Sequence, residues 1–171
     1  MNTLVIVGCC DKKRAAKCAA RDLYMSPLFR WARTYAEKYG TAGWLIASAE
    51  HGLLRPDDVI APYDRRLPTA HDERWAWRHL AQAGFACWLG DHPEYCAGPV
   101  LTGLRIEVIA GRDYAELLGR TAMKNYMTEP LAGLPIGQRL SWLRRAVKEG
   151  LPAARALECP LFPDLDNTTP V

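Results

Sequence analysis

Three short apolar runs constrain the fold of this chain more than any other feature. They cover Thr3–Val7, Trp44–Ala47 and Leu104–Ala110, and glycines bound them. Runs of this length and composition are typical of strands that are buried on both faces of a parallel sheet. Segments with helical periodicity lie between the runs, so we expect an α/β fold built from right-handed βαβ units.

The first helical segment carries the clearest signals. Ser26 offers a hydroxyl group as N-cap, Pro27 suits the first turn, and Gly40 follows the last apolar residue. Three further helices are expected, together with a weaker strand at Tyr126–Pro130. One helix is expected to begin at Thr69 with Asp72 and to have Trp77, Leu80, Gly84 and Trp88 on its apolar face. A short helix is expected around Tyr114–Leu118. The last helix is expected to have Ile136, Leu140, Leu143 and Val147 on one face and to end at Gly150.

Chain length and turn residues predict the domain organisation. A chain of 171 residues suits one α/β domain, which we place at residues 1–150, with a mostly parallel sheet of about four strands flanked by helices. The Pro-rich remainder, residues 151–171, is expected to form a tail. Arg55–Pro68 and Gly90–Gly103 are rich in turn residues, so we predict loops there.

Charge alone does not identify a partner. The formal net charge of +3 is smaller than that of a typical nucleic-acid-binding domain, although it allows such a partner. Basic residues cluster in two places, and a phosphate group could be held if the fold brings the clusters together. The first cluster is Lys12, Lys13, Arg14, Lys17 and Arg21, and the second is Arg139, Arg144 and Arg145.

The sequence also gives expectations about compartment and cofactors. It has no secretory leader and no stretch of about 18 apolar residues, so we expect a cytoplasmic protein with no membrane partner. The six cysteines are then expected as reduced thiols, and they lack the paired spacing of a zinc site. The nucleotide motifs GxGxxG and GxxxxGK[ST] do not occur. We therefore expect neither a metal nor a cofactor, and the oligomeric state stays open.

The ends of the predicted strands are where chemistry is expected. In open parallel sheets, ligands bind beyond the carboxyl ends of the strands, near the point where the winding reverses. Glu50 and His51 follow the second strand and form the best acid–base pair, with Asp57 as a further carboxylate. The alternative is that Glu50 is solvated and that Asp57 caps a turn.

Two cysteines end the first strand. Cys9 and Cys10 lie close in sequence to Lys12 and Lys13, where a thiolate nucleophile could be activated. The alternative is a pair of small buried residues at a strand-to-loop turn. The sequence alone leaves both interpretations open.

Aromatic residues in the candidate loops suit stacking on a nucleobase. Tyr24, Tyr63 and Tyr114 lie in these loops, near basic residues. The tryptophans in or beside predicted regular elements are instead expected in the core. They are Trp31, Trp44, Trp77 and Trp142.

Four motifs span the chain from about Thr3 to Leu143, namely GCCDKK…ARDLYMSPLFRWARTYAE, WLIASAEHGLLRPDDVIAPYDRRL, IAGRDYAELL and PLAGLPIGQRLSWL. In content and order they resemble a family of uncharacterised bacterial, archaeal and phage proteins that are described as related to the peroxide-stress protein YaaA. The resemblance implies a small Rossmann-like sheet and an association with DNA in phage, defence and base-modification settings. It also implies kinship with enzymes that act on the N-glycosidic bond.

The family pattern maps onto residues along the whole matched region. This chain departs from the pattern at Cys10, Asp11 and His51, and in an insertion-like stretch at Gly90–Gly103. The positions that match are Cys9, Lys12, Arg21, Tyr24, Ser26, Phe29, Ser48, Glu50, His51, Gly52, Leu53, Pro56, Tyr63, Gly111, Tyr114, Gly137 and Leu140.

Two functional hypotheses follow. In the first, the protein is an N-glycosidase acting on a modified base in DNA or a nucleotide, and a carboxylate of Glu50 or Asp57 stabilises an oxocarbenium-like state. His51 would donate to the base. The substrate would be bound by Cys9, Lys12, Lys13, Arg21, Tyr24, Ser48, Tyr63, Tyr114 and Arg139.

In the second hypothesis, the same loops form a nucleic-acid or nucleotide-binding module without catalysis. A thiol-based redox role of Cys9 and Cys10 is a third alternative. The first hypothesis requires Glu50, His51 and Lys12 to line one pocket with Tyr63 and Tyr114.

Overall fold

A five-stranded sheet forms the centre of the protein, in the order β4-β3-β1-β8-β9. The computed structural model describes residues 1–97 and 100–150. The strands are β1 (Asn2–Gly8), β3 (Trp44–Ser48), β4 (Gly52–Leu54), β8 (Leu104–Ile109) and β9 (Met127–Thr128). The pairs β1–β3, β1–β8 and β8–β9 are parallel and β3–β4 is antiparallel. The sheet is therefore mostly parallel, as predicted, but has five strands where about four were expected.

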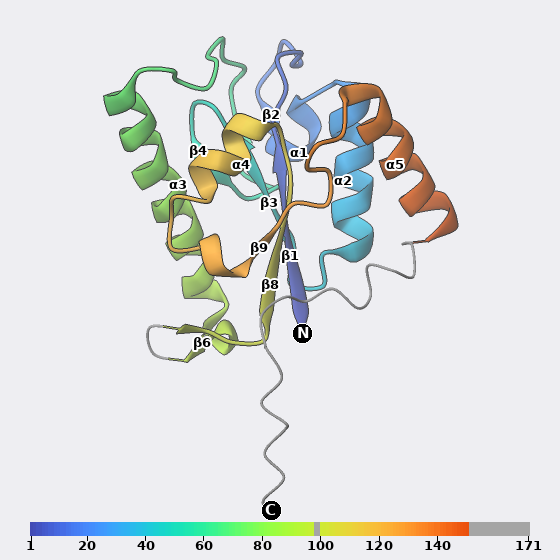
Figure 1. Ribbon diagram of the computed structural model, residues 1–171. Helices are drawn as coiled ribbons and strands as arrows, with labels where there is room; N and C mark the ends of the chain where they lie inside the picture. The colour runs from blue at the N-terminus through green and yellow to red at the C-terminus, as the bar shows by residue number, and fades with distance from the viewer. Residues whose placement is uncertain (98–99, 151–171) are drawn as a thin grey trace, which may run out of the picture.

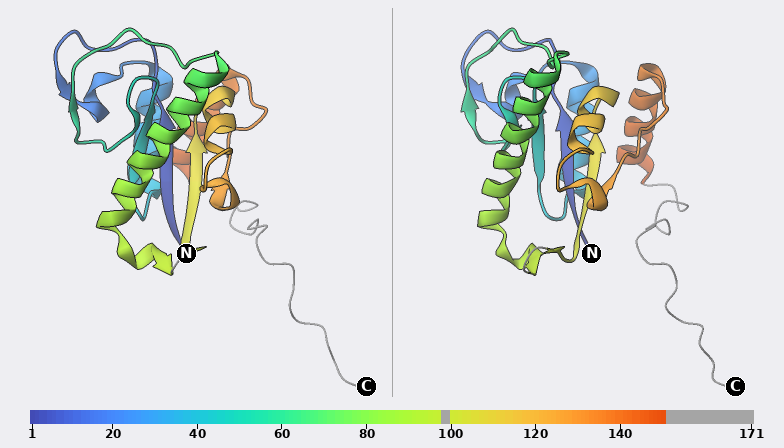
Figure 2. Two further views of the ribbon diagram at one scale, coloured as in Figure 1. Left: turned by 90° about the vertical axis from the view of Figure 1, so that its left-hand side faces the viewer. Right: turned by 60° about the vertical axis from the view of Figure 1, so that its left-hand side comes forward.

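Helices cover both faces of this sheet. The helices α2 (Pro27–Tyr39) and α5 (Ile136–Glu149) lie against one face. The helices α3 (His71–Asp91) and α4 (Arg112–Leu118) lie against the other face. Figures 1 and 2 show the resulting three layers, with the sheet between two helical layers. The α/β fold class expected from the alternating pattern is confirmed.

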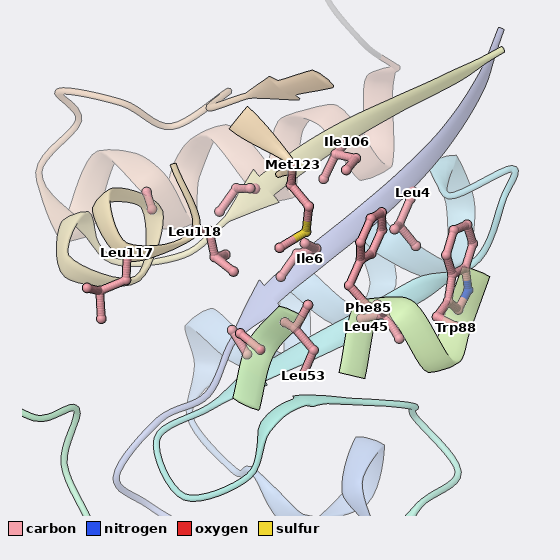
Figure 3. Packing of buried hydrophobic residues seen from close by; sticks show 14 of the residues in the cluster. Leu4, Ile6, Leu45, Leu53, Phe85, Trp88, Ile106, Leu117, Leu118 and Met123 are labelled. Atoms are coloured by element: carbon pink, nitrogen blue, oxygen red, sulfur yellow. The ribbon is translucent and has the colours of Figure 1, made fainter. Parts of the chain in front are cut away.

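The central strand β1 explains why both helical layers are needed. Leu4 and Ile6 point into the cluster beneath α3 and α4, which Figure 3 shows from close by. Val5 and Val7 point into the cluster beneath α2 and α5. All four side chains are fully buried, so a helical layer on each face of β1 removes the aliphatic groups of that face from water.

The connections leave neighbouring strands in opposite directions. From β1 the chain passes to α2 on one face of the sheet, whereas from β8 it passes to α4 on the other face. The carboxyl ends of β1 and β8 are adjacent, because Val7 pairs with Ile109. Two loops that diverge in this way leave a crevice between them, which is where open α/β sheets bind ligands.

Local signals placed α2 well and missed several short elements. Ser26 Oγ accepts a hydrogen bond of 3.1 Å from Phe29 N, and Gly40 is the C-cap, as predicted. The segments predicted as loops also contain short regular elements, because a pair of two-residue strands leaves no periodic pattern. The short elements of the chain are β2 (Cys18–Ala19), α1 (Ala20–Leu23), β5 (Val59–Ile60), η1 (Pro93–Tyr95), β6 (Cys96–Ala97), β7 (Val100–Leu101) and η2 (Lys124–Tyr126).

The face that α3 buries agrees with the predicted stripe except at Leu80. Trp77 and Trp88 are buried as predicted, whereas Leu80 is exposed and Ala81 and Phe85 are buried. Gly84 lets α3 approach β4 closely, next to Leu53. The predicted cap at Thr69 with Asp72 is also wrong, because the helix starts at His71 and its N-cap, Ala70, makes no side-chain bond.

The apolar face of α5 is also shorter than predicted. Leu143 and Ala146 are buried against the α2 layer, but Ile136 is 75% exposed. The first turn of α5 is held by polar contacts of Arg139 instead, which we describe below.

The remaining predictions concern thiols, membranes and the tail. Cys9, Cys10, Cys18, Cys87 and Cys96 are free thiols. Cys159 and the predicted tail at residues 151–171 lie outside the described residues. Among the helices of the described segments, none is both long and apolar enough to cross a membrane.

We predict opposite effects for two glycine-to-alanine substitutions in α3. A Cβ atom at Gly84 would lie 2.4 Å from the carbonyl oxygen of Leu53, so Gly84→Ala should lower the free energy of unfolding by about 1–3 kcal/mol. Gly90 lies in the same helix with no atom within 4 Å of such a Cβ, so Gly90→Ala should raise it by about 0.4–1 kcal/mol. Urea unfolding measures both, and equal shifts would contradict the close packing of α3 on β4.

Candidate functional site

A small cavity marks the crevice between the ends of β1 and β8. Its volume is about 60 Å³. Cys9, Cys10 and Gly111 line it from the loops that leave the two strands. Ser26 lines it from the start of α2, and Arg139 from α5. The structure therefore brings the predicted residues Cys9 and Arg139 together, although they lie far apart in the sequence.

Ser48, at the end of β3, is the centre of a hydrogen-bond network. Its side chain is fully buried. Its Oγ accepts from the backbone N–H groups of His51 at 3.1 Å and Glu50 at 3.3 Å, which holds the turn between β3 and β4. Gly52 completes that turn with a φ of 70°, a conformation that favours glycine.

Two tyrosine hydroxyl groups extend this network. Tyr63 Oη lies 2.8 Å from Ser48 Oγ and 2.9 Å from Tyr24 Oη. Because Ser48 Oγ already accepts two hydrogen bonds, its own proton is donated to Tyr63. Tyr63 can then donate to Tyr24. This order gives the network a direction from Ser48 to Tyr24, which is buried.

The ring of Tyr63 has an aromatic neighbour on its edge and a cation over its face. The His51 ring meets it in a T-shaped arrangement with a centroid distance of 5.4 Å. Lys13 Nζ lies 4.2 Å from its centroid, within the range of a cation–π contact. Three predicted residues from separate loops therefore converge here. Aromatic and cationic groups in one place are suited to binding a nucleobase.

Cys9 and Tyr114 connect the crevice to the α3 and α4 layer. Cys9 Sγ lies 3.1 Å from Tyr114 Oη, and the Tyr114 ring packs edge-on against Trp77 at 5.6 Å. Trp77 Nε1 donates to the carbonyl oxygen of Ser48 at 2.8 Å. Trp77 is buried, as predicted. It also links Tyr114 to the end of β3, a role that its helical position did not reveal.

Glu50 lies at the edge of this group. Its carboxylate Oε2 is 3.3 Å from Nη1 of Arg65, and its side chain is about one-third exposed. Arg65 follows Tyr63 closely in the sequence, so the same loop supplies a ring and the partner of Glu50. This proximity to Tyr63 was the signal that could have identified Arg65 as a site residue.

The three tyrosines are neutral hydrogen-bonding groups near neutral pH. Burial raises the pKa of Tyr24 to about 12, above its ordinary value near 10. Burial, followed by repulsion from negative charge at Cys9, also raises the pKa of Tyr63 and Tyr114. The phenols therefore donate and accept hydrogen bonds and do not act as phenolates.

Other predicted residues lie elsewhere or have other partners. Asp57 is exposed and pairs with Arg21 at 2.8 Å. Lys12 is exposed, and its carbonyl oxygen accepts from Cys10 Sγ at 3.3 Å. Lys13, and not Lys12, reaches the aromatic group. The hydrogen-bond partner of the Cys9 thiol is the Tyr114 phenol.

Metal binding has no visible basis in this arrangement. Within residues 1–97 and 100–150, no group of three or more His, Cys, Asp or Glu side chains could hold a metal ion.

Comparisons with known proteins place these residues in a wider group. Residues 4–145 match a family described as "Family of unknown function (DUF6884)". The chain is also similar to "Uncharacterized protein YfjM" of Bacillus subtilis (strain 168), with 29% identity over 158 residues, 87% of this chain and 97% of that protein. No solved structure matches the chain significantly.

We predict that Ser48→Ala destabilises the protein through its hydrogen bonds. The substitution leaves the N–H groups of Glu50 and His51 without their acceptor, so the free energy of unfolding should fall by about 1–3 kcal/mol. Ser141→Ala is the control, because that hydroxyl is exposed and bonds one carbonyl, and its effect should stay within about 0.5 kcal/mol. Equal losses in thermal unfolding would show that Ser48 does not hold the turn.

We also predict that Tyr24 ionises late and that alkali destabilises the fold. Folding favours the neutral phenol of Tyr24. Its contribution to the free energy of unfolding is therefore complete below the pKa of Tyr24 in the unfolded chain, near 10, and is lost as the pH rises through about 12. Ultraviolet absorbance should show fewer ionised tyrosines at pH 11 than in the unfolded chain, and Tyr24→Phe should remove one late group. Simultaneous ionisation of all the tyrosines near their ordinary pKa would contradict this prediction.

Proposed function

Because the chain belongs to DUF6884, a family of unknown function, we propose its activity from the site itself: the protein binds a nucleobase and hydrolyses its N-glycosidic bond. The observation that carries this proposal is the convergence of Tyr63, His51 and Lys13 beside the directed network that ends at Tyr24. Aromatic and cationic groups suit the rings of a base, and hydroxyl groups suit its ring nitrogens or carbonyl oxygens.

The proposed reaction uses one carboxylate and one proton donor. The bond between the sugar carbon and the base nitrogen breaks, and its electron pair leaves with the base, which takes a proton from His51. Glu50 stabilises the positive charge on the sugar and accepts a proton from water as the water oxygen bonds to the sugar carbon. The products are the free base and the sugar, with one water added across the bond.

The arrangement supports Glu50 over Asp57 for the carboxylate role. Glu50 is joined through its backbone to Ser48 and lies next to His51 in the turn. Both carboxylates pair with an arginine, but the Asp57 side chain is 75% exposed whereas that of Glu50 is 35% exposed. A carboxylate beside the proposed base-binding surface acts at shorter range than a solvated one.

Two finer features belong to the same proposal. We propose that the sheet is Rossmann-like, which the order β3-β1-β8-β9 with helices on both faces supports. We also propose kinship with the YaaA-related proteins, which the four sequence motifs support. DNA or a nucleotide is the proposed partner on these grounds.

Substitution of Glu50 tests the reaction. Purified protein should release free base from at least one member of a panel of modified nucleotides and oligonucleotides, measured by chromatography. Glu50→Gln should lower kcat by about a hundredfold or more while substrate binding persists. Glu37→Gln is the matched control, because Glu37 also pairs with an arginine but lies on α2.

Two outcomes would contradict parts of this proposal. If the wild-type protein binds nucleotides or DNA but releases no base from the whole panel, the binding-module alternative holds. If Glu50→Gln releases base as fast as Glu37→Gln, the assignment of Glu50 is wrong. Salt-dependent binding that is unchanged in Glu50→Gln would be expected of a module without chemistry.

A further inference from the structure

A larger groove continues from the small cavity beside Cys9. The cavity, at about 60 Å³, has room for about two waters and is too small for a sugar or base. It shares Ala110, Leu131 and Arg139 with a groove of about 590 Å³. A volume of that size falls within the range of small-molecule sites. The groove lies at the end of β8, where α4 and the start of α5 occupy opposite faces of the sheet (Figure 1).

Arg139 holds a fixed position in this groove. Its Nε donates to the carbonyl oxygen of Leu134 at 2.6 Å, and its Nη1 donates to that of Ala110 at 2.9 Å. Carbonyl oxygens orient the guanidinium plane without cancelling its charge. In the described part of the chain these bonds use Nε and Nη1, which leaves the N–H groups of Nη2 for a ligand. A fixed guanidinium loses little conformational entropy when it binds an anion.

Arg112 adds a second positive charge to the groove. It is the first residue of α4, it is exposed, and it lines the groove together with Arg139. Glu129 also lines the groove. Two arginines and one glutamate leave a net charge of +1 there, so an anion of the size of a phosphate group is the favoured occupant.

We propose that this groove binds a phosphate group of the substrate through Arg139 and Arg112. The inference rests on the proposed function, because it assumes that the phosphate belongs to a substrate whose base lies against Tyr63. It assigns phosphate binding to a different set of residues from Lys12, Lys13 and Arg21. Of these, Lys13 covers Tyr63 and Arg21 pairs with Asp57.

Phosphate binding to the full chain tests the proposal. The probes are inorganic phosphate, deoxyribose 5-phosphate and a short oligonucleotide, and the amide signals of Ala110, Leu131 and Gly133 report on the groove. Arg112→Gln should weaken binding of deoxyribose 5-phosphate about tenfold, since each charge-assisted bond contributes roughly that much. Arg112 has an exposed side chain, so this variant should keep its fold.

Two further variants sharpen the test. Glu129→Gln should strengthen phosphate binding, because it removes the one carboxylate of the groove. Arg145→Gln should leave binding unchanged, because Arg145 is exposed on α5 and does not line the groove. If the phosphate belongs to a mononucleotide, deoxyribose 5-phosphate should shift the amide signals of the groove. If it belongs to DNA, the oligonucleotide should shift them more strongly.

The two proposals can fail separately. If phosphate binding is the same in Arg112→Gln, Glu129→Gln and the wild-type protein, the groove proposal is overturned, even if base release is observed. If Arg112→Gln weakens phosphate binding but no substrate releases base, the groove stands and the glycosidase proposal fails. If inorganic phosphate and both sugar-phosphate probes leave the groove signals unshifted, the groove is not a phosphate site.

Discussion

The position of β1 is the constraint on which the rest of the structure depends. This strand is hydrogen-bonded on both edges, to β3 and to β8, and it is apolar on both faces. Both helical layers are required to cover it. The chain leaves β1 and β8 towards opposite faces, so the residues that follow these adjacent strands lie where the two helical layers diverge. The crevice with Cys9 and Gly111 is a consequence of this topology.

The polar part of the site is built from groups that are uncharged and fixed. Ser48 is buried and accepts from the backbone of its own turn, so its hydroxyl has one remaining direction in which to donate. That direction determines the orientation of the Tyr63 and Tyr24 hydroxyl groups. The charged residues lie around them, with Lys13 over Tyr63, Arg65 beside Glu50 and Arg139 across the crevice. A ligand therefore meets preorganised donors and acceptors, with charge supplied from the rim.

The sequence predicted the main elements because each is long enough to show a period. The run Thr3–Val7 and the capped segment from Ser26 to Gly40 correspond to β1 and α2. The three residues of β4 escaped prediction, since so short an edge strand has no distinctive pattern. The predicted buried face of α3 was wrong at Leu80. Which residues of this helix are buried depends on its close approach to Leu53, a residue distant in sequence.

The predicted site residues that lie together come from strand ends. Ser48 is the last residue of β3, Glu50 and His51 follow β3, Cys9 follows β1, and the parallel order of these strands brings them to one edge of the sheet. The contribution of Arg112 could not be read from the sequence. It depends on where the turn after β9 lies relative to the start of α4, and local periodicity carries no information about such long-range packing.

The shortness of β4 and β9 also affects how this sheet meets other chains. Strands of three and two residues form the two borders of the sheet, and α3 packs against β4. Such borders expose few free backbone donors and acceptors, so a strand from another molecule would find little to pair with. The long aliphatic strands that would template intermolecular β-structure are kept in the interior. The arrangement that creates the crevice therefore also protects the protein against edge-to-edge aggregation.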